Sequence, residues 1–236
     1  MKPVQPPSQE SPVLKKTESG LSLISQLGEL RIDFLGDNKY WKHLAGKKEL
    51  IAKACGLGKG AQTVMDLTSG LGEDAWTLAR LGFQVTSFER QPLLHAMLAE
   101  AKQKFEESEK KAPDLKVDFR LGDSQQVLKR ILADESTERP DVIYYDPMFL
   151  IPGRTAKPKK DMQILALLTE SAGTAGVGEE KEILQLSLRV ATQRVVVKRW
   201  IKAPSLSEKF QHQVLGKSIR FDCYQVASHS RSRSSI

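Results

Sequence analysis

The segment from Val64 to Leu81 constrains the fold of this chain more than any other. A short apolar run leads into a turn with two glycines, Gly70 and Gly72, and then into apolar residues spaced three and four apart, which predict a helix. Glycine permits positive φ and lets a ligand approach the backbone closely. A second apolar run, 84–88, ends in Glu89, which lies 19 residues after Gly70, near the roughly 20 typical of a ribose-binding carboxylate. Together these elements predict an α/β fold with a nucleoside site.

The first residues of the predicted helix indicate the kind of nucleoside cofactor. Asp74 and Ala75 stand where a dinucleotide-binding turn would have its third glycine. Glu73 and Asp74 would repel a phosphate at the helix N-terminus, where an NAD enzyme places its pyrophosphate. Acids at this position suit a cofactor with positive charge and no phosphate. S-adenosylmethionine fits this description, with its sulfonium, its amino group and its adenosine.

A second motif, Asp146-Pro147-Met148-Phe149, follows the apolar run 142–145, which predicts a buried strand. Parallel α/β sheets bind ligands beyond the carboxyl ends of their strands, where this tetrapeptide would lie. Its carboxylate and a backbone carbonyl can accept the two N–H bonds of a planar amine while the aromatic ring stacks on the amine's face, and proline fixes the turn. The alternative is an ordinary strand-to-loop turn. Combined with the upstream motif, the tetrapeptide predicts methyl transfer to an exocyclic nitrogen.

Several segments resemble the ribosomal RNA small subunit methyltransferase J family, which methylates guanine N2 with S-adenosylmethionine. The segment 66–75 is similar to the family's D-x-T-A-G-L-G-R-D-A, and the segment 145–149 to its L-D-P-M-F. Four further segments resemble family motifs in the same order: Phe88-Glu89-Arg90-Gln91-Pro92, Lys159-Lys160-Asp161-Met162, Arg194-Val195-Val196-Val197-Lys198-Arg199 and Arg220-Phe221-Asp222-Cys223-Tyr224. The resemblance spans roughly residues 30 to 226.

The resemblance implies a Rossmann-like class I methyltransferase, α/β, with a largely parallel sheet and helices on both faces. It also implies that a guanine of small-subunit (16S) ribosomal RNA is the substrate. Glu73 stands where the family has arginine, which reverses the charge there, and the segment 39–48 keeps the family's basic character but loses most of its glycines. With the two glycines of the turn, the expected cofactor-binding residues are Gly70, Gly72, Glu73, Asp74, Glu89, Arg90, Asp123, Ser124 and Asp146.

Individual roles follow from the side-chain chemistry. The Glu89 carboxylate can accept hydrogen bonds from two adjacent ribose hydroxyls. Asp123 could meet the adenine amino group or cap the helix that follows it, and both roles remain open. Asp146, Pro147 and Phe149 are the expected catalytic residues: the first two accept the amine's hydrogen bonds, and the third stacks on the base. Whether Asp146 also takes the proton is left open.

The positive charge of this chain is concentrated after the second motif. The formal net charge is +7, and residues 151–220 contain 13 Lys or Arg against 6 Asp or Glu. Basic side chains beside an active site can follow a phosphate backbone. We therefore expect RNA contacts from Lys159, Lys160, Lys198 and Arg199, the alternative being a solvated basic surface.

Domain organisation is expected to be simple. Residues 1–20 should be a disordered tail, 21–60 a small lead-in, 61–227 the methyltransferase domain, and 228–236 a flexible tail. Cys55 and Cys223 form no metal or disulfide pattern, so no metal is expected. The sequence shows no signal peptide or transmembrane stretch, which favours a cytoplasmic protein without a membrane partner. It does not indicate an oligomeric state.

Two other classes of function remain as alternatives. One is an exocyclic-amine methyltransferase for adenine N6 or a protein amide, whose motifs usually read Asn/Asp-Pro-Pro-aromatic, so Met148 argues against it. The other is a non-catalytic RNA-binding protein on a methyltransferase fold, against which the presence of Asp146 and Glu89 argues.

Overall fold

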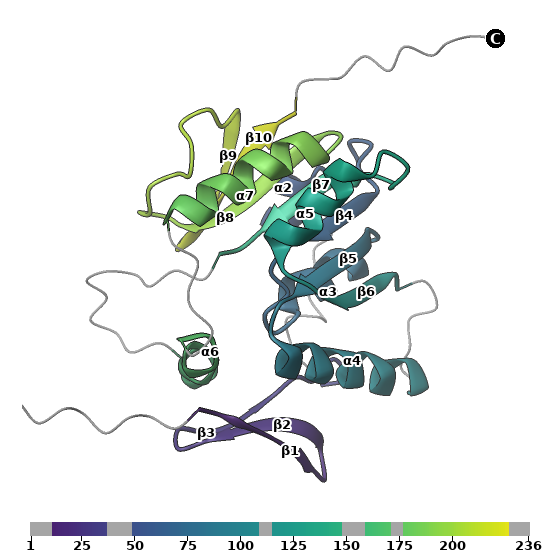
Figure 1. Cartoon of the computed structure of the whole chain (residues 1–236), viewed down its shortest axis with the longest axis vertical. Helices are drawn as coiled ribbons and strands as arrows, with labels where there is room; N and C mark the ends of the chain where they lie inside the picture. The colour runs from purple at the N-terminus through teal and green to yellow at the C-terminus, as the bar shows by residue number, and fades with distance from the viewer. Residues whose placement is uncertain (1–10, 37–48, 109–114, 148–158, 171–176, 227–236) are drawn as a thin grey trace, which may run out of the picture.

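The computed structural model describes residues 11–36, 49–108, 115–147, 159–170 and 177–226. Among these residues, the largest sheet has seven strands in the order β6-β5-β4-β7-β8-β10-β9 (Figure 1). Only β10 runs antiparallel to its two neighbours, while β6, β5, β4, β7 and β8 are mutually parallel. The strands span Thr63–Asp66 (β4), Gln84–Glu89 (β5), Val117–Leu121 (β6), Val142–Tyr145 (β7), Arg194–Trp200 (β8), His212–Leu215 (β9) and Ile219–Gln225 (β10).

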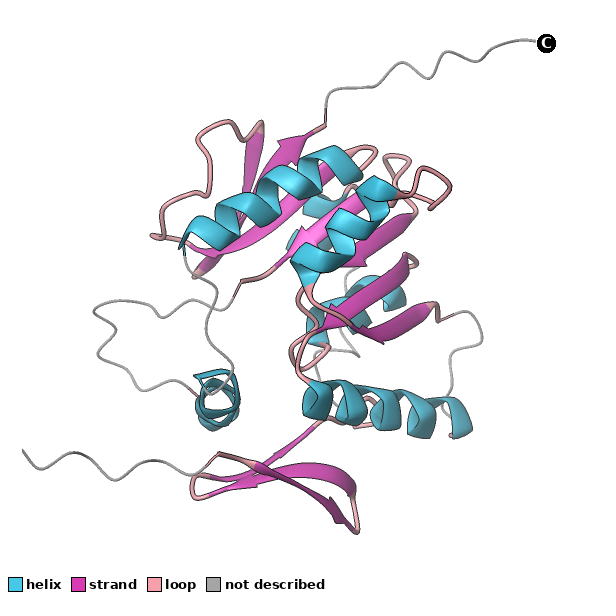
Figure 2. Cartoon of the chain, viewed as in Figure 1, coloured by secondary structure: helices cyan, strands magenta, loops and turns pink. Residues whose placement is uncertain are grey.

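Helices cover both faces of this sheet, as Figure 2 shows, which confirms the predicted fold class. One apolar cluster joins a face of the sheet to α2 (Leu50–Cys55), α3 (Glu73–Arg80), α4 (Pro92–Glu107) and α6 (Lys160–Glu170). A second cluster joins the other face to α5 (Ser124–Ala133) and α7 (Val177–Val190). Strands covered on both sides should be apolar throughout, and all four residues of β7 are buried.

The helix after β5 forms as its sequence predicts. Pro92 is its first residue, where the missing N–H of proline removes no helical hydrogen bond. Helical spacing predicts one buried stripe, and the buried side of α4 consists of the residues with that spacing: Leu94, Met97, Leu98, Ala101 and Phe105. Each of the larger side chains among them contributes on the order of 1.5–3 kcal/mol when fully buried.

A three-stranded antiparallel sheet precedes the main sheet in the chain and lies beside α4 and α6 (Figure 1). Its strands are Val13–Thr17 (β1), Gly20–Ser25 (β2) and Gly28–Arg31 (β3). The expectation of disorder over 1–20 is therefore wrong for β1. Leu23 on β2 and Leu30 on β3 are buried in the main apolar core, so the small sheet is anchored there. The polar composition of residues 1–20 gave no sign of this anchoring.

Two polar contacts fasten this small sheet to α4. The Leu21 N–H donates to Glu100 Oε2 at 2.6 Å, and Lys104 Nζ donates to the Ser19 carbonyl at 2.8 Å. Residues 1–10 and the expected C-terminal tail lie outside the described residues.

Other expected elements shift by a few residues. The sequence of residues 30–34 predicts a short strand, but β3 spans Gly28–Arg31; residues 48–55 predict a helix, which begins at Leu50 as α2. Gly216-Lys217-Ser218, which matches part of a phosphate-loop pattern, connects β9 to β10 and leads into a strand rather than a helix. In the part of the chain that the structure describes, no helix is long and apolar enough to cross a bilayer.

Candidate active site

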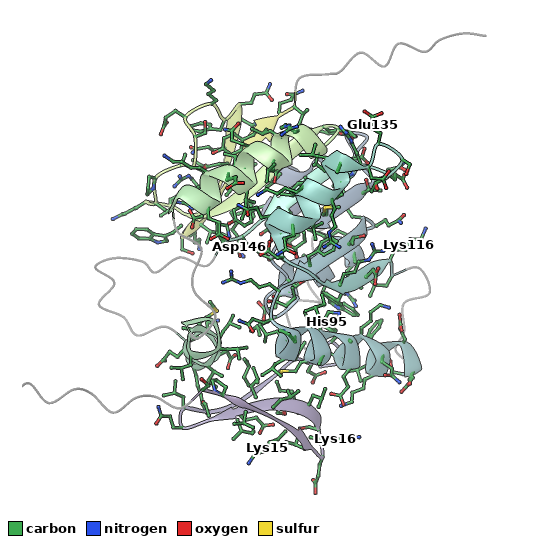
Figure 3. All side chains as sticks on the ribbon, in the orientation of Figure 1. Lys15, Lys16, His95, Lys116, Glu135 and Asp146 are labelled. Carbon is green, nitrogen blue, oxygen red and sulfur yellow. The ribbon has the colours of Figure 1, made fainter. Side chains whose placement is uncertain are left out.

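A pocket lies at the edge of the main sheet where β4, β5, β6 and β7 end. Because these strands are parallel, the segments that follow them meet there. Figure 3 labels Asp146 at the end of β7 on this edge. The lining residues are Leu67, Thr68, Gly70, Phe88, Glu89, Arg90, Leu94, Asp123, Ser124, Tyr145, Asp146, Pro147, Leu165, Glu179, Glu180 and Ile183.

The glycine turn after β4 is held by the acid at the end of β5. Glu89 Oε2 accepts the Gly70 N–H at 2.9 Å, and its Oε1 accepts the Gln91 N–H at 2.8 Å. Desolvation by burial raises the pKa of Glu89, and these two hydrogen bonds oppose the rise. The spacing of Gly70 and Glu89 thus produces a direct contact, and Glu89 also lines the pocket.

The two glycines of the turn have different reasons to be glycine. Gly70 has φ +53°, and a Cβ built there would meet nothing within 4 Å, so the backbone lies open to an approaching ligand. Gly72 has φ +79°, and a Cβ there would lie 2.6 Å from Leu98 and 2.9 Å from Phe34. Gly72 is therefore required for packing under the turn, and it does not line the pocket.

Asp66, at the end of β4, organises the same turn from below. Its Oδ1 accepts the Thr68 N–H at 2.9 Å, and its Oδ2 accepts the Ser87 hydroxyl at 2.6 Å. The Thr68 hydroxyl in turn accepts the Asp146 N–H at 2.8 Å, which joins the two motifs of the sequence. Complete burial raises the pKa of Asp66 to about 7, and the Ser87 hydrogen bond opposes this.

The segment after β6 forms the wall next to this turn. Asp123 caps α5, accepting the Gln126 N–H at 3.0 Å, and it lines the pocket as well. The Ser124 hydroxyl donates to the Leu67 carbonyl at 2.6 Å, so this wall is fixed to the end of β4. The capping role of Asp123 is confirmed, and its place on the wall leaves a binding role available.

Asp146 and Asp74 share one lysine. Lys198 Nζ on β8 lies 2.9 Å from Asp146 Oδ2 and 2.6 Å from Asp74 Oδ2. The Tyr144 hydroxyl donates to the same Asp74 oxygen at 2.6 Å. Desolvation by burial raises the pKa of Asp146 to about 6; the Lys198 charge lowers it and the Asp74 charge raises it further. Burial lowers the pKa of Lys198, but its two carboxylates outweigh burial, so the net shift is upward and the lysine stays charged.

The residues expected to contact RNA separate into two pairs. Lys159 and Lys160 are exposed at the start of α6. Arg199 is 4% exposed, and its guanidinium donates to the Pro204 carbonyl at 2.7 and 3.1 Å and to Glu180 at 3.5 Å. The expected RNA contact of Arg199 is therefore wrong, because burial and internal hydrogen bonds occupy its donors. Lys198 likewise faces carboxylates of the site instead of the outer surface.

Most of the predicted site residues meet at this pocket. Its lining includes Gly70, Glu89, Arg90, Asp123, Ser124, Asp146 and Pro147. Glu73, where the chain departs from the resembled family, is exposed and does not line it, whereas Asp74 reaches the site through Lys198. Phe149 and Met148 lie outside the described residues.

Sequence reasoning missed Lys198 as part of the site, together with Tyr144 and Thr68. One signal was available: Lys198 and Arg199 continue directly from Val195-Val196-Val197, a run typical of a strand buried on both faces. Charged residues at the end of such a strand are expected to face inward and to be paired. Glu179 and Glu180, which also line the pocket, gave no comparable signal.

Comparisons with known proteins identify the family of this chain. The family model described as putative SAM-dependent methyltransferase matches residues 3–226. The chain is 35% identical over 225 residues to ribosomal RNA small subunit methyltransferase J from Pseudoalteromonas atlantica, covering 91% of this chain and 85% of that protein. It is 36% identical over 232 residues to the protein of the same name from Alkalilimnicola ehrlichii, covering 94% and 85%. A crystal structure of a SAM-dependent methyltransferase from Neisseria gonorrhoeae has a TM-score of 0.71 and 25% identity, covering 99% of this chain and 90% of that one.

Proposed function

Because this chain belongs to the ribosomal RNA small subunit methyltransferase J family, we propose that it methylates the exocyclic N2 of a guanine in small-subunit ribosomal RNA. Relatives that bear this enzyme's name match the chain over most of their length, and the family is S-adenosylmethionine-dependent. The observation that carries the proposal is the meeting of Glu89, Gly70 and Asp146 around one pocket. The substrate is the RNA or the small subunit that contains it, and the reaction belongs to the cytoplasm, where ribosomal subunits are assembled.

The residues of the pocket fit S-adenosylmethionine. Apolar side chains line it beside carboxylates, among them Glu89 and Asp123, with Arg90 as a basic lining residue, which suits an adenosine attached to a cationic group better than a phosphate. The open space beside Gly70 lets a ligand lie directly against the turn. Glu89 would hold the ribose hydroxyls, and the wall formed by Asp123 and Ser124 would meet the adenine. When bound, S-adenosylmethionine supplies a methyl group on a positively charged sulfur, which becomes a neutral thioether as the nitrogen–methyl bond forms.

Asp146 prepares the amine for this displacement. Guanine N2 is a weak nucleophile because its lone pair is delocalised into the ring. Hydrogen bonds from its two N–H groups to the Asp146 carboxylate and the Pro147 carbonyl direct that lone pair at the methyl group, and most of the rate gain comes from this alignment. The proton that the nitrogen loses passes to the Asp146 carboxylate. For Phe149, the aromatic residue of the motif, the proposed role is to stack on the base.

The base has to leave any helix to enter the pocket, so the protein binds it turned out of its stack. Lys159 and Lys160, exposed at the start of α6, supply phosphate contacts in this arrangement.

Substitution of Asp146 tests the proposal. Asp146→Asn keeps the shape but removes the charge, and we expect methylation to fall by about 10²–10³-fold because charge stabilisation in the transition state is lost. The measurement is methyl transfer from S-adenosylmethionine to a small-subunit ribosomal RNA transcript and to isolated small subunits, with the product nucleoside identified by mass spectrometry. Asp118→Asn, an exposed carboxylate paired with Arg120 on β6, is the matched control and should retain wild-type activity.

Several outcomes would contradict the proposal. An Asp146→Asn protein that methylates at the wild-type rate would show that the motif after β7 is structural. N6-methyladenine or a methylated protein amide as product would assign the chain to the other exocyclic-amine methyltransferases. RNA binding without any methylation by the wild-type protein would assign it to non-catalytic RNA-binding proteins.

A further inference from the structure

Lys198 is placed beside Asp146 by the register of the sheet. Strands β7 and β8 are parallel, and Tyr145 pairs with Val197, so the next residues, Asp146 and Lys198, are neighbours just beyond the end of β7. Side chains alternate between the two faces of a strand. Lys198 therefore shares a face with Val196, whose cluster also contains the core residues of α3. This direction brings its ammonium group to the N-terminal end of α3, where Asp74 lies.

Lys198 contacts one of the two oxygens of the Asp146 carboxylate. The ammonium group binds Oδ2 of Asp146 at 2.9 Å, so lysine and amine can use different oxygens of the same carboxylate. The second contact, to Asp74 at 2.6 Å, holds the ammonium group itself in place, because the Tyr144 hydroxyl donates to the same Asp74 oxygen and fixes this carboxylate. Only 23% of the Lys198 side chain is exposed, which makes this position suited to an internal role.

Lys198 offsets the negative charge of the carboxylates around Asp146. Asp74 on α3 and Asp66 on β4 are both near enough to interact with the carboxylates of the site. Tyr144 on β7 contributes a hydroxyl that burial keeps neutral, since its pKa is raised well above the usual value. Arg199 on β8 also acts on Asp146, and it is paired with Glu180. Lys198 is in direct contact with Asp146, so it offsets this negative charge at the shortest range.

We propose that Lys198 is a positioning residue for methyl transfer, which orients the Asp146 carboxylate and keeps it ionised so that it can accept the hydrogen bond of the substrate amine. This inference rests on the proposed function of Asp146. Lys198 acts through Asp146 and does not touch the reacting atoms. Through Asp74 it also connects the catalytic carboxylate to the first turn of α3, next to the glycine turn that faces the cofactor.

The inference has a consequence for the pH dependence of the rate. The active form of Asp146 is the carboxylate, so the rate falls as the pH drops through the Asp146 pKa, which burial raises to about 6. An opposite charge in contact lowers a carboxyl pKa by about 1–3 units, so its removal shifts the acidic limb of the profile upward by about one unit or more. In Lys198→Met, kcat at pH 7 should thus fall about twofold for a shift of one unit and about tenfold for a shift of two units, and it should recover towards the wild-type value at alkaline pH.

The experiment compares Lys198→Met with Lys198→Arg and the control Lys202→Met, an exposed lysine just beyond β8. The pH profile of kcat is measured with a small-subunit ribosomal RNA transcript and S-adenosylmethionine. A parallel readout independent of activity is the titration of the Asp146 side-chain carboxyl by carbon NMR, assigned with Asp146→Asn. We expect the acidic limb and the carboxyl titration to move upward together in Lys198→Met, while Lys198→Arg, which keeps the charge, stays near the wild-type profile and Lys202→Met matches it.

An unchanged Asp146 titration in Lys198→Met would overturn the inference, whether or not the enzyme is active on the chosen RNA. So would a loss of RNA affinity with a smaller salt slope and an unchanged pH profile, since that result would make Lys198 a phosphate-binding residue. If Lys198→Met does not fold, Lys198→Gln, which keeps a hydrogen-bond donor, provides the same titration. A wild-type protein that leaves the RNA unmethylated refutes the proposed function alone, because the carboxyl titration still tests the role of Lys198.

Discussion

The start of α6 and the end of β8 each carry two adjacent basic residues, and the fold gives the two pairs opposite environments. Lys159 and Lys160 are exposed, whereas Lys198 and Arg199 are 23% and 5% exposed at their side chains and bind carboxylates. Strand β8 lies inside the sheet with helices over both faces, so two successive side chains must both point into the protein. Lys198 meets Asp74 and Asp146 on one face, and Arg199 meets Glu180 on the other.

Charge near an active site therefore has two uses that composition does not separate. An exposed lysine can neutralise a phosphate, while an inward one fixes the ionisation and the orientation of a carboxylate. The excess of positive charge after the second motif mixes both, because Arg220 is also buried and donates to Asp222 and to backbone carbonyls of the segment after β8. Three experiments test whether the inward and the outward pair differ in this way.

The largest effect is expected for stability at Arg199. In Arg199→Met the buried Glu180 loses its partner, and we expect the free energy of unfolding to fall by about 3–5 kcal/mol, as is typical when one member of a buried ion pair is removed. Urea unfolding measures the change. Lys159→Met is the matched control and should change stability by less than about 0.5 kcal/mol.

A double variant shows whether the destabilisation at Arg199 comes from the pair. Arg199→Met with Glu180→Gln removes the uncompensated charge and should recover part of the stability. If Arg199→Met unfolds like the wild type but binds ribosomal RNA more weakly, the internal role of Arg199 is contradicted, because Arg199 would then contact RNA.

The second test concerns an inward carboxylate. Burial raises the pKa of Asp66 from 3.8 to about 7, so its contribution to stability is fully present below the lower value and is lost as the pH rises through the higher one. Asparagine does not titrate. The free energy of unfolding of Asp66→Asn, relative to the wild type, should therefore rise with pH across this window, by an amount on the order of a few kcal/mol.

Urea unfolding at a series of pH values measures this trend, with Asp161→Asn on the exposed start of α6 as the control. Parallel stability curves for Asp66→Asn and the wild type would show that the buried carboxylate is ionised at all these pH values, contrary to the expectation.

The smallest effect is expected at the outward pair. Charge reversal at Lys159 and Lys160 should leave stability and cofactor affinity unchanged and weaken the binding of ribosomal RNA. The slope of log affinity against log salt should become shallower by about 0.7 for each phosphate of a single strand that the protein no longer neutralises. Lys116→Glu is the control, an exposed lysine just before β6 and so at the opposite end of that strand from the pocket (Figure 3). Equal weakening by the two sets of variants would mean that RNA binding depends on net charge and not on the start of α6.

The sequence predicted the parallel core and the pocket well because their signals are local. The Glu89–Gly70 contact is encoded within a short stretch, which contains a glycine turn, a helix and an acid at the end of the next strand. The register of β4 with β5 then brings the two residues together. The stripe of α4 follows from helical periodicity alone. The strand β1 was missed because its residues alternate too weakly, and its stability depends on pairing with β2, which α4 holds in place.

From the sequence alone, the order of the elements and the edge of the sheet at which the pocket lies can be predicted, with Glu89, Asp123 and Asp146 among the carboxylates that line it. Which charges meet depends on the tertiary structure. Lys198 is 52 residues from Asp146 and 124 from Asp74 in the chain, and their contact depends on β8 lying next to β7 and on α3 covering that face. Strand neighbours and helix placement come from the burial of whole faces, a property of the assembled core that no local pattern contains.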